Sequence, residues 1–181
     1  MLFKFAIISD EVDHFFREIT IDSDCTFLDL NNAILESCGY DDSQITTFYT
    51  CSDSWEHEQQ IVREDMGTSP EDQDVYIMAE TILGDIIEDE GQKLIFTFDP
   101  INDRVFYIEM SEIVTGQSLD RAECTKSRGQ APQQLSDFDL DFSNLAPGGK
   151  NNGGSSLDLD FDNTEGFNED EYDPDSYTVE D

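Results

Sequence analysis

The histidines are the first residues of this sequence that could carry chemistry. There are two, His14 and His57, and His57 stands between Glu56 and Glu58. A histidine beside a carboxylate can act as a general base or as a metal ligand. However, the sequence has no HxH or HxxxH spacing that would place two imidazoles on one metal ion. A solvated histidine in an acidic segment is therefore the better interpretation.

Two carboxylate clusters are the next candidates. The segments DEVD (10–13) and GYDD (39–42) could hold Mg²⁺ for phosphodiester hydrolysis. A nuclease also needs Lys or Arg to grip phosphates, and residues 1–116 contain only five such bases. Solvated acidic loops are thus favoured over a metal site. We predict no catalytic residue, no bound metal and no cofactor.

The cysteine pattern indicates a reduced protein. Its four cysteines include no CxxC pair, so neither a zinc site nor a redox motif is indicated. Cys38 falls on the apolar stripe of a predicted helix and Cys51 at the end of a predicted strand. Burial explains both thiols, and we expect an intracellular protein without disulfides.

The charge balance excludes several classes of function. The chain of 181 residues has 43 acids and 9 bases, a net charge of −34. Such a chain is not a typical nucleic-acid binder and is repelled by anionic membranes. No apolar run approaches the roughly 18 residues of a membrane helix, and the opening MLFKFAIISDEVD is unlike a signal peptide. We expect a cytoplasmic protein with no direct contact to nucleic acid or membrane.

The composition changes after residue 116. All fifteen isoleucines lie between Ile7 and Ile113. Residues 117–181 are rich in Ser, Gly, Pro, Asn, Gln and acids, and Val179 is their single β-branched aliphatic residue. Such a segment cannot bury enough apolar surface to offset the entropy of ordering it. The sequence therefore predicts a folded domain over 1–116 and a disordered acidic tail over 117–181.

The tail contains an internal repeat. SDFDLDFSN (136–144) and SSLDLDFDN (155–163) both alternate aspartate with Phe or Leu. This alternation is typical of acidic-hydrophobic docking segments, in which charge keeps apolar anchors solvated until a groove captures them. The alternative is a solubilising tail whose repeat is accidental. The predicted partner-binding anchors are Phe138, Leu140, Phe142, Leu157, Leu159 and Phe161. The expected partner is a protein with a basic or apolar groove.

The elements that would position these residues follow from apolar periodicity. Alternation of period two predicts a strand over 3–7 and an antiparallel partner over 15–21. Spacing of three and four predicts a helix over 26–38, with Asp24 or Thr26 as N-cap and Gly39 as the left-handed residue after its end.

The middle of the chain predicts further strands and a second helix. Residues 45–51 have strand character, whereas QQIVRE and VYIMAE are apolar runs of uncertain type. ETILGDIIEDEG predicts a short helix closed by Gly91, and KLIFTF and RVFYIEM predict a hairpin around the turn DPIND (99–103). The expected fold is α+β, with a mostly antiparallel sheet, one main helix and a second short helix.

Four segments, in this order, resemble a known family. They are FFREI (15–19), TFLDLNNAILESCGYDDSQITTF (26–48), TILGDIIEDEGQKLIFTFDPIND (81–103) and RAECTKSRGQAP (121–132). They are similar to the W-R-R-I strand, the T-L-x-D-L-H helix with its G-W-D-D continuation, the hairpin and the closing segment of the Ri-plasmid ORF three-like family. That family includes passenger proteins of some insertion sequences. The resemblance covers about residues 3–133.

The chain departs from the family pattern at its polar positions. Phe16 and Tyr40 replace two tryptophans, and Gln44 with Thr46 or Thr47 replaces two histidines. The resemblance therefore implies a fold more than a function. We expect a non-enzymatic protein-interaction module. Two alternatives remain open: an acidic mimic of nucleic acid that occupies a basic protein groove, and a mobile-element-associated, metal-dependent enzyme acting on nucleic acid.

Overall fold

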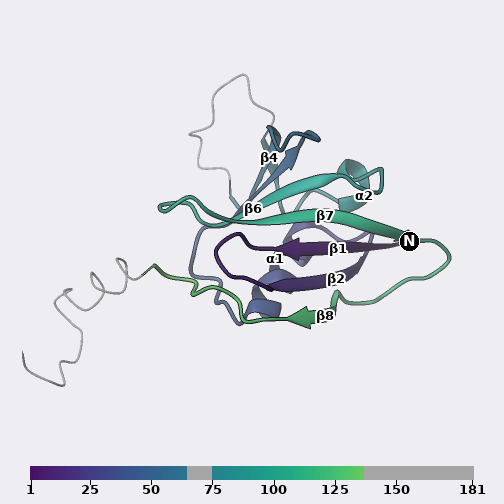
Figure 1. Cartoon of the computed structure of the whole chain (residues 1–181). Coiled ribbons are helices and arrows are strands. Elements are labelled where there is room, and N and C mark those ends of the chain that lie inside the picture. The colour runs from purple at the N-terminus through teal and green to yellow at the C-terminus, as the bar shows by residue number, and fades with distance from the viewer. Residues whose placement is uncertain (65–74, 137–181) are drawn as a thin grey trace, which may run out of the picture. The chain divides into compact units, whose positions relative to one another are not determined.

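The computed structural model describes residues 1–64 and 75–136. Strands predominate in this part of the chain (Figure 1). The elements are β1 (Leu2–Ile8), β2 (Phe16–Asp22), α1 (Phe27–Cys38), β3 (Thr47–Cys51), β4 (His57–Val62), β5 (Val75–Ile77), α2 (Leu83–Ile86), β6 (Lys93–Asp99), β7 (Arg104–Val114) and β8 (Glu123–Arg128). Neither of these two helices is long and apolar enough to cross a membrane. The α+β class, with one main and one short helix, is confirmed.

The strands form one sheet in the order β5-β4-β3-β6-β7-β1-β2-β8. Neighbouring strands are antiparallel except β4 and β5, which are parallel. The predicted pairing of the first two strands is confirmed, with Phe5 opposite Ile19. The hairpin around residues 99–103 is also confirmed, because β6 and β7 pair on either side of it. The two runs of uncertain type contribute β4 and β5.

Helix α1 begins and ends as its sequence predicts. Thr26 is the N-cap: its hydroxyl accepts from the Asp29 N–H, and the Asp29 carboxylate accepts from the Thr26 N–H. Gly39 follows the helix with φ +71°, the left-handed conformation that glycine adopts without a Cβ penalty. Helix α2 is shorter than expected. It ends at Ile86, and Gly91 instead lies in the turn before β6, so the prediction that Gly91 closes this helix was wrong.

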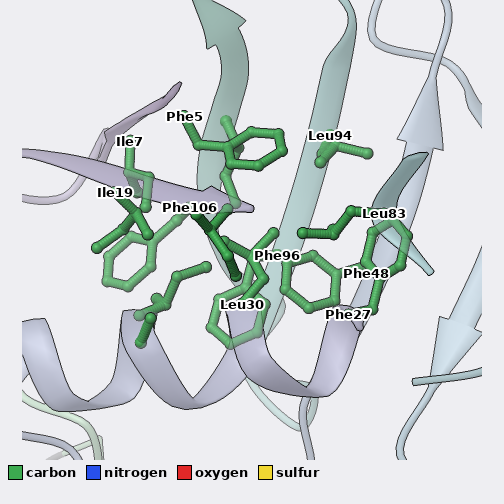
Figure 2. Close-up of a cluster of buried hydrophobic side chains, with 14 of the residues drawn as sticks. Phe5, Ile7, Ile19, Phe27, Leu30, Phe48, Leu83, Leu94, Phe96 and Phe106 are labelled. Atoms are coloured by element: carbon green, nitrogen blue, oxygen red, sulfur yellow. The ribbon is translucent and has the colours of Figure 1, made fainter. Parts of the chain in front are cut away.

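The hydrophobic core lies between α1 and one face of the sheet (Figure 2). Leu30 of α1 is fully buried and belongs to the same core cluster as Phe96 and Phe106 of the central strands. Phe106 stacks or tilts against several rings of the core, including Phe98 at a centroid distance of 4.5 Å. The fully buried aromatic residues are Phe3, Phe5, Phe27, Phe48, Phe96, Phe98 and Phe106. Since each large side chain contributes about 1.5–3 kcal/mol when buried, these rings dominate the stability of the fold.

The ordered chain continues beyond residue 116, and the predicted boundary there was wrong. Strand β8 pairs with β2 from Glu123 opposite Thr20 to Arg128 opposite Phe16. Every residue of β8 is exposed, whichever face of the sheet its side chain lies on. The sequence of β8 therefore has no apolar alternation that would predict a strand. Backbone pairing and polar contacts of Thr125 and Lys126 with Glu18 hold this strand instead of hydrophobic burial. The predicted anchors, all between 138 and 161, lie outside the described residues.

Gly129, directly after β8, provides a test of this junction. Its φ is +65°, and a Cβ there would stand 2.8 Å from the His14 carbonyl oxygen. Gly116 has a similar φ of +74° with open space around it. We expect Gly129→Ala to lower the free energy of unfolding by about 2–4 kcal/mol, from backbone strain plus the clash, and Gly116→Ala by about 1–2 kcal/mol from strain alone.

Urea denaturation of both variants measures the difference. The two glycines share their backbone conformation, so the loss in Gly116→Ala measures the backbone strain alone. Subtracting it from the loss in Gly129→Ala leaves the cost of the clash with His14. Equal losses in the two variants would contradict the close approach of Gly129 to the β1–β2 turn.

Candidate functional site

The segments that carry the family resemblance meet at one end of the sheet. Arg17 of β2, Tyr40 after α1 and Arg104 of β7 all contact residues 129–134, which we call the strap. The strap follows β8 and crosses from Arg17 to the β6–β7 turn. Residues more than 100 positions apart in the sequence thus form one polar cluster, and this cluster is the first candidate for a functional site.

Arg17 is a buried cation bound by backbone carbonyls. Its side chain lies on the core-facing side of β2, and only 5% of the residue is exposed. The guanidinium is 4.6 Å from the centroid of the Phe15 ring. It donates to the carbonyl oxygens of Ser37, Phe16, Arg128 and Gly129 at 2.8–3.2 Å. No carboxylate of residues 1–64 or 75–136 forms an ion pair with it. Arg17 therefore joins the end of α1, β2 and β8.

Tyr40 fastens the middle of the strap. Its hydroxyl donates to the Pro132 carbonyl oxygen at 2.6 Å, and its ring packs on Phe98 and Phe106. Burial raises the pKa of the Tyr40 hydroxyl, so this group stays protonated and remains a donor at neutral pH. Tyr40 stands where the family pattern has tryptophan, and the phenol adds a hydrogen bond to the packing.

Arg104 fastens the end of the strap. It binds the Glu11 carboxylate through two nitrogens at 2.8–3.1 Å and lies 3.5 Å from the Asp99 carboxylate. It also donates to the carbonyl oxygens of Gln133 and Gln134. The hydrogen bonds that Arg104 donates to the negatively charged Glu11 carboxylate raise the pKa of Arg104. The strap is therefore held at both ends by arginines.

This cluster can anchor a chain, but its donors are already used. The strap carbonyls occupy the hydrogen-bond donors of Arg17, Tyr40 and Arg104. Hydrolytic or transfer chemistry needs a nucleophile within reach of a base. No such pair is formed here. Within the described ranges no three His, Cys, Asp or Glu residues gather in a way that could hold a metal ion. We assign the cluster a structural role.

The histidines and carboxylates singled out in the sequence do not come together. His57 is exposed on β4 and stacks on the Tyr49 ring with 4.2 Å between centroids. His14 is exposed in the β1–β2 turn. In the DEVD segment Glu11 pairs with Arg104, and in GYDD the Asp41 carboxylate accepts from Ser43. These groups stabilise turns and one ion pair.

Two of the four thiols are poor nucleophiles because of their surroundings. Burial raises the pKa of Cys38 and of Cys51 to about 11. At neutral pH both are thiols, and the thiolate is the reactive form. Cys51 is buried at the end of β3, as predicted, whereas Cys38 is half-buried. No disulfide joins the four cysteines.

Three pockets in the described part of the chain are open and polar. Two adjoin along α1, with volumes of about 390 and 520 Å³, and share Glu36 and Arg121, which form an ion pair of 2.7 Å. A third, of about 530 Å³, includes Asp53, Glu58 and Asp89 in its lining. Small-molecule sites are usually enclosed and mostly apolar with a few placed polar groups. These pockets lack that character.

The bases of the described part are engaged within the protein. Each contacts a carboxylate, a carbonyl oxygen or an aromatic ring; the eight are Lys4, Arg17, Arg63, Lys93, Arg104, Arg121, Lys126 and Arg128. A nucleic-acid site needs several cations on one surface, available to phosphates. The arrangement of these bases does not provide one.

The sequence did not predict that Arg17 and Arg104 bind the strap. One signal was present: Arg17 stands in the apolar phase of its strand, between Phe15 and Ile19. A charged residue on the inward face of a strand indicates a buried polar network. The acceptors, however, are backbone carbonyls from distant segments, and side-chain patterns carry no information about them.

The comparisons with known proteins agree with this fold. The chain resembles the crystal structure of a protein of unknown function, MM3350 from Methanosarcina mazei Go1, with a TM-score of 0.54 at 15% identity; the match covers 70% of this chain and 68% of that one. A comparison with curated proteins found no match. The family model described as plasmid pRiA4b ORF-3-like protein matches residues 3–139, which include all four segments of the sheet-end cluster. The chain belongs to the plasmid pRiA4b ORF-3-like protein family.

Proposed function

We propose that this protein is a non-enzymatic interaction module that docks on other proteins through its acidic C-terminal segment (137–181). The observation that carries this proposal is the duplicated pattern of 136–144 and 155–163, which alternates aspartate with Phe or Leu. A segment kept soluble only for its charge has no need of six large apolar residues in two matching sets. A docking motif needs both apolar residues and acids, because the apolar anchors supply affinity and the acids supply solubility and electrostatic steering.

The folded part supports this proposal by what its polar groups do. The sheet-end cluster uses its donors on the strap, and the cations of the domain are paired internally. The strap places Ser136, directly before the first repeat, beside Asn102 at the β6–β7 turn. The domain thus provides a fixed attachment point for the segment that follows. Two copies on one chain raise the avidity for a partner with two grooves, or allow one chain to bridge two partners.

Replacing the six anchors by serine tests the proposal. This variant changes Phe138, Leu140, Phe142, Leu157, Leu159 and Phe161 and keeps every charge. For a partner isolated with the wild-type chain, we expect affinity to fall at least tenfold, measured by surface plasmon resonance. The matched control replaces the six aspartates of the two repeats by asparagine, and we expect it to slow association and weaken the salt dependence. Unchanged affinity in the serine variant would mean that the six apolar residues are not docking anchors and that the segment acts only through its charge.

A second candidate function is the acidic mimic of nucleic acid, which the net charge of −34 favours. A mimic binds a basic groove through charge, so its affinity falls steeply with salt and competes with DNA. The serine variant keeps the charges, and a mimic would therefore bind as tightly as wild type. The same pair of variants thus distinguishes docking by apolar anchors from mimicry by charge.

A further inference from the structure

The face of the sheet opposite α1 carries a continuous cross-strand row. The register places Tyr49 of β3 opposite Ile95 of β6, Ile95 opposite Tyr107 of β7, and Tyr107 opposite Ile8 of β1. The row continues through Phe16 of β2. In order across seven strands, the residues of the row are Gln60, Tyr49, Ile95, Tyr107, Ile8, Phe16 and Arg128. Side chains opposite one another on a sheet contact each other, so this row is one apolar surface with polar ends.

Much of this row is open to solvent among the described residues, although Ile95 at its centre is buried, with 6% of the residue exposed. The core cluster contains the buried side chains of α1 and the other face of the sheet, and it includes no member of the row. Ile8 is 49% exposed, although it is a large aliphatic residue in a strand. Tyr49, Tyr107 and Phe16 are half-buried. An aromatic and aliphatic patch open to solvent on a sheet face is typical of a binding surface.

Trp55 lies over the row from the β3–β4 turn. Its ring meets the Tyr107 ring edge-on at 5.0 Å, and the Lys93 ammonium lies 5.0 Å from the indole centroid. Its φ is +66°, a left-handed conformation that bulky residues rarely adopt. Hydrogen bonds with Ser52 hold the turn, including one from the Trp55 N–H at 2.9 Å. A strained backbone thus places the single tryptophan of the chain at the exposed apolar surface.

Acids that form no ion pair within the described residues lie beside the row. Two bases of this face form ion pairs, Lys4 with Glu112 and Lys126 with Glu18, each at 2.7 Å. Lys93 instead contacts the Asp53 carbonyl oxygen and the Trp55 ring, and Arg128 stands at the end of the row. Glu109 stands on the same face, two residues after Tyr107, and forms no ion pair with any described residue.

The turn at the Ile8 end of the row adds further acids. Asp10 and Asp13 are exposed there, between Ile8 and Phe16. Neither forms an ion pair within the described ranges. Acids therefore adjoin the open half of the row, from Tyr107 to Phe16.

We propose that this face binds a basic amphipathic segment of a partner protein. Its aliphatic side chains lie over Tyr107, Ile8 and Phe16, and its Lys or Arg side chains contact Glu109 and the acids of the β1–β2 turn. This inference rests on the proposed function and assigns the domain a docking surface and a class of partner. Charge complementarity selects that partner: a second copy would bring −34 against −34, and an anionic lipid surface would be repelled in the same way.

Intrinsic fluorescence tests the proposal on the full chain, because Trp55 is the only tryptophan and contacts the row. The probe is a peptide of about twelve residues that alternates Lys and Leu, a length that spans the row when extended. We expect a saturable change in Trp55 emission and weaker binding at high salt. A peptide alternating Lys with Ser is the control for charge alone, and one alternating Glu with Leu is the control for the sign of the charge. We expect at least tenfold weaker binding of each.

Two variants locate the binding on the sheet face. Ile8→Ser removes an exposed side chain, so the fold remains, and we expect about threefold weaker binding. Adding Tyr107→Thr removes the ring and introduces a β-branched residue that is compatible with a strand, and we expect at least a tenfold loss for the pair. Ile45→Ser is the matched control, because Ile45 is 62% exposed but lies outside the strands, and we expect no effect.

Several results would overturn the inference. These are an emission that the Lys–Leu peptide does not change, equal binding of the Lys–Ser peptide, and full affinity of the Ile8→Ser/Tyr107→Thr variant. Sedimentation that shows a dimer dissociated by the same variant would assign the face to a second copy instead. The serine variant of the C-terminal anchors separates the two proposals. If this variant no longer captures the partner but its Trp55 emission still responds to the Lys–Leu peptide, the two binding surfaces lie on different parts of the chain.

Discussion

A chain that ends at residue 116 is expected to fail to fold, whereas one that ends at residue 136 is expected to be as stable as the full chain to within about 1 kcal/mol. The shorter chain loses β8 and the strap, so β2 becomes an unpaired edge. Arg17 loses the carbonyls of Arg128 and Gly129, and Tyr40 loses that of Pro132. These losses together amount to about 5–10 kcal/mol, comparable with the whole stability of a small domain.

Circular dichroism and gel filtration of the two truncated chains measure this effect. We expect cooperative thermal unfolding from the chain ending at 136, and aggregation or loss of the cooperative transition from the chain ending at 116. The longer chain is the control, because it keeps every element of the described structure. Identical midpoints in the two chains would show that β8 and the strap add nothing to the fold.

Replacing Arg17 is expected to destabilise the folded domain strongly. Arg17→Ala leaves buried carbonyls of three segments without a donor and creates a cavity beside Phe15, and we expect a loss of about 3–5 kcal/mol in the free energy of unfolding. Arg17→Met fills the cavity but cannot donate. If hydrogen bonding dominates, Met recovers less than half of the loss. Arg17→Lys also recovers little, because one ammonium cannot reach both the Ser37 and Gly129 carbonyls.

Urea denaturation of the three Arg17 variants tests this role. Arg121→Ala is the matched control: Arg121 pairs with Glu36 at 2.7 Å, but its side chain is 76% exposed, so solvent screens the pair and we expect a loss below about 1 kcal/mol. A Met variant as stable as wild type would mean that Arg17 acts through packing and that its hydrogen bonds are replaceable.

Most of the elements could be predicted because their apolar spacing matches their secondary structure. Phe3, Phe5 and Ile7 alternate as β1 requires, and Thr26 and Gly39 mark the ends of α1. Such signals are local: a strand or helix that buries one face repeats its apolar residues with the period of its backbone. The β-hairpin around 99–103 was recognisable for the same reason, since turn residues separate two alternating runs.

Local signals failed where backbone groups form the contacts. Strand β8 is exposed on both faces, so nothing in Glu123–Arg128 distinguishes it from a loop. Gly91 has a left-handed φ, as a residue after a helix often does, but the same conformation serves a turn before β6. A glycine in the sequence indicates that a positive φ is possible at its position, but it does not indicate whether a helix end or a turn uses that conformation.

The charge, the α+β class, the family and the boundaries of the main helix could all be predicted from the amino-acid sequence, because each depends on residue type or on short-range spacing. The contacts of Arg17, Tyr40 and Arg104 with one strap, and the alignment of Tyr49, Ile95, Tyr107, Ile8 and Phe16 in one cross-strand row, are visible in the folded chain alone. Both depend on strand order and register. Pairing strands that are distant in sequence is a property of the whole sheet, since the hydrogen bonds that set the register are made by backbone groups common to every residue.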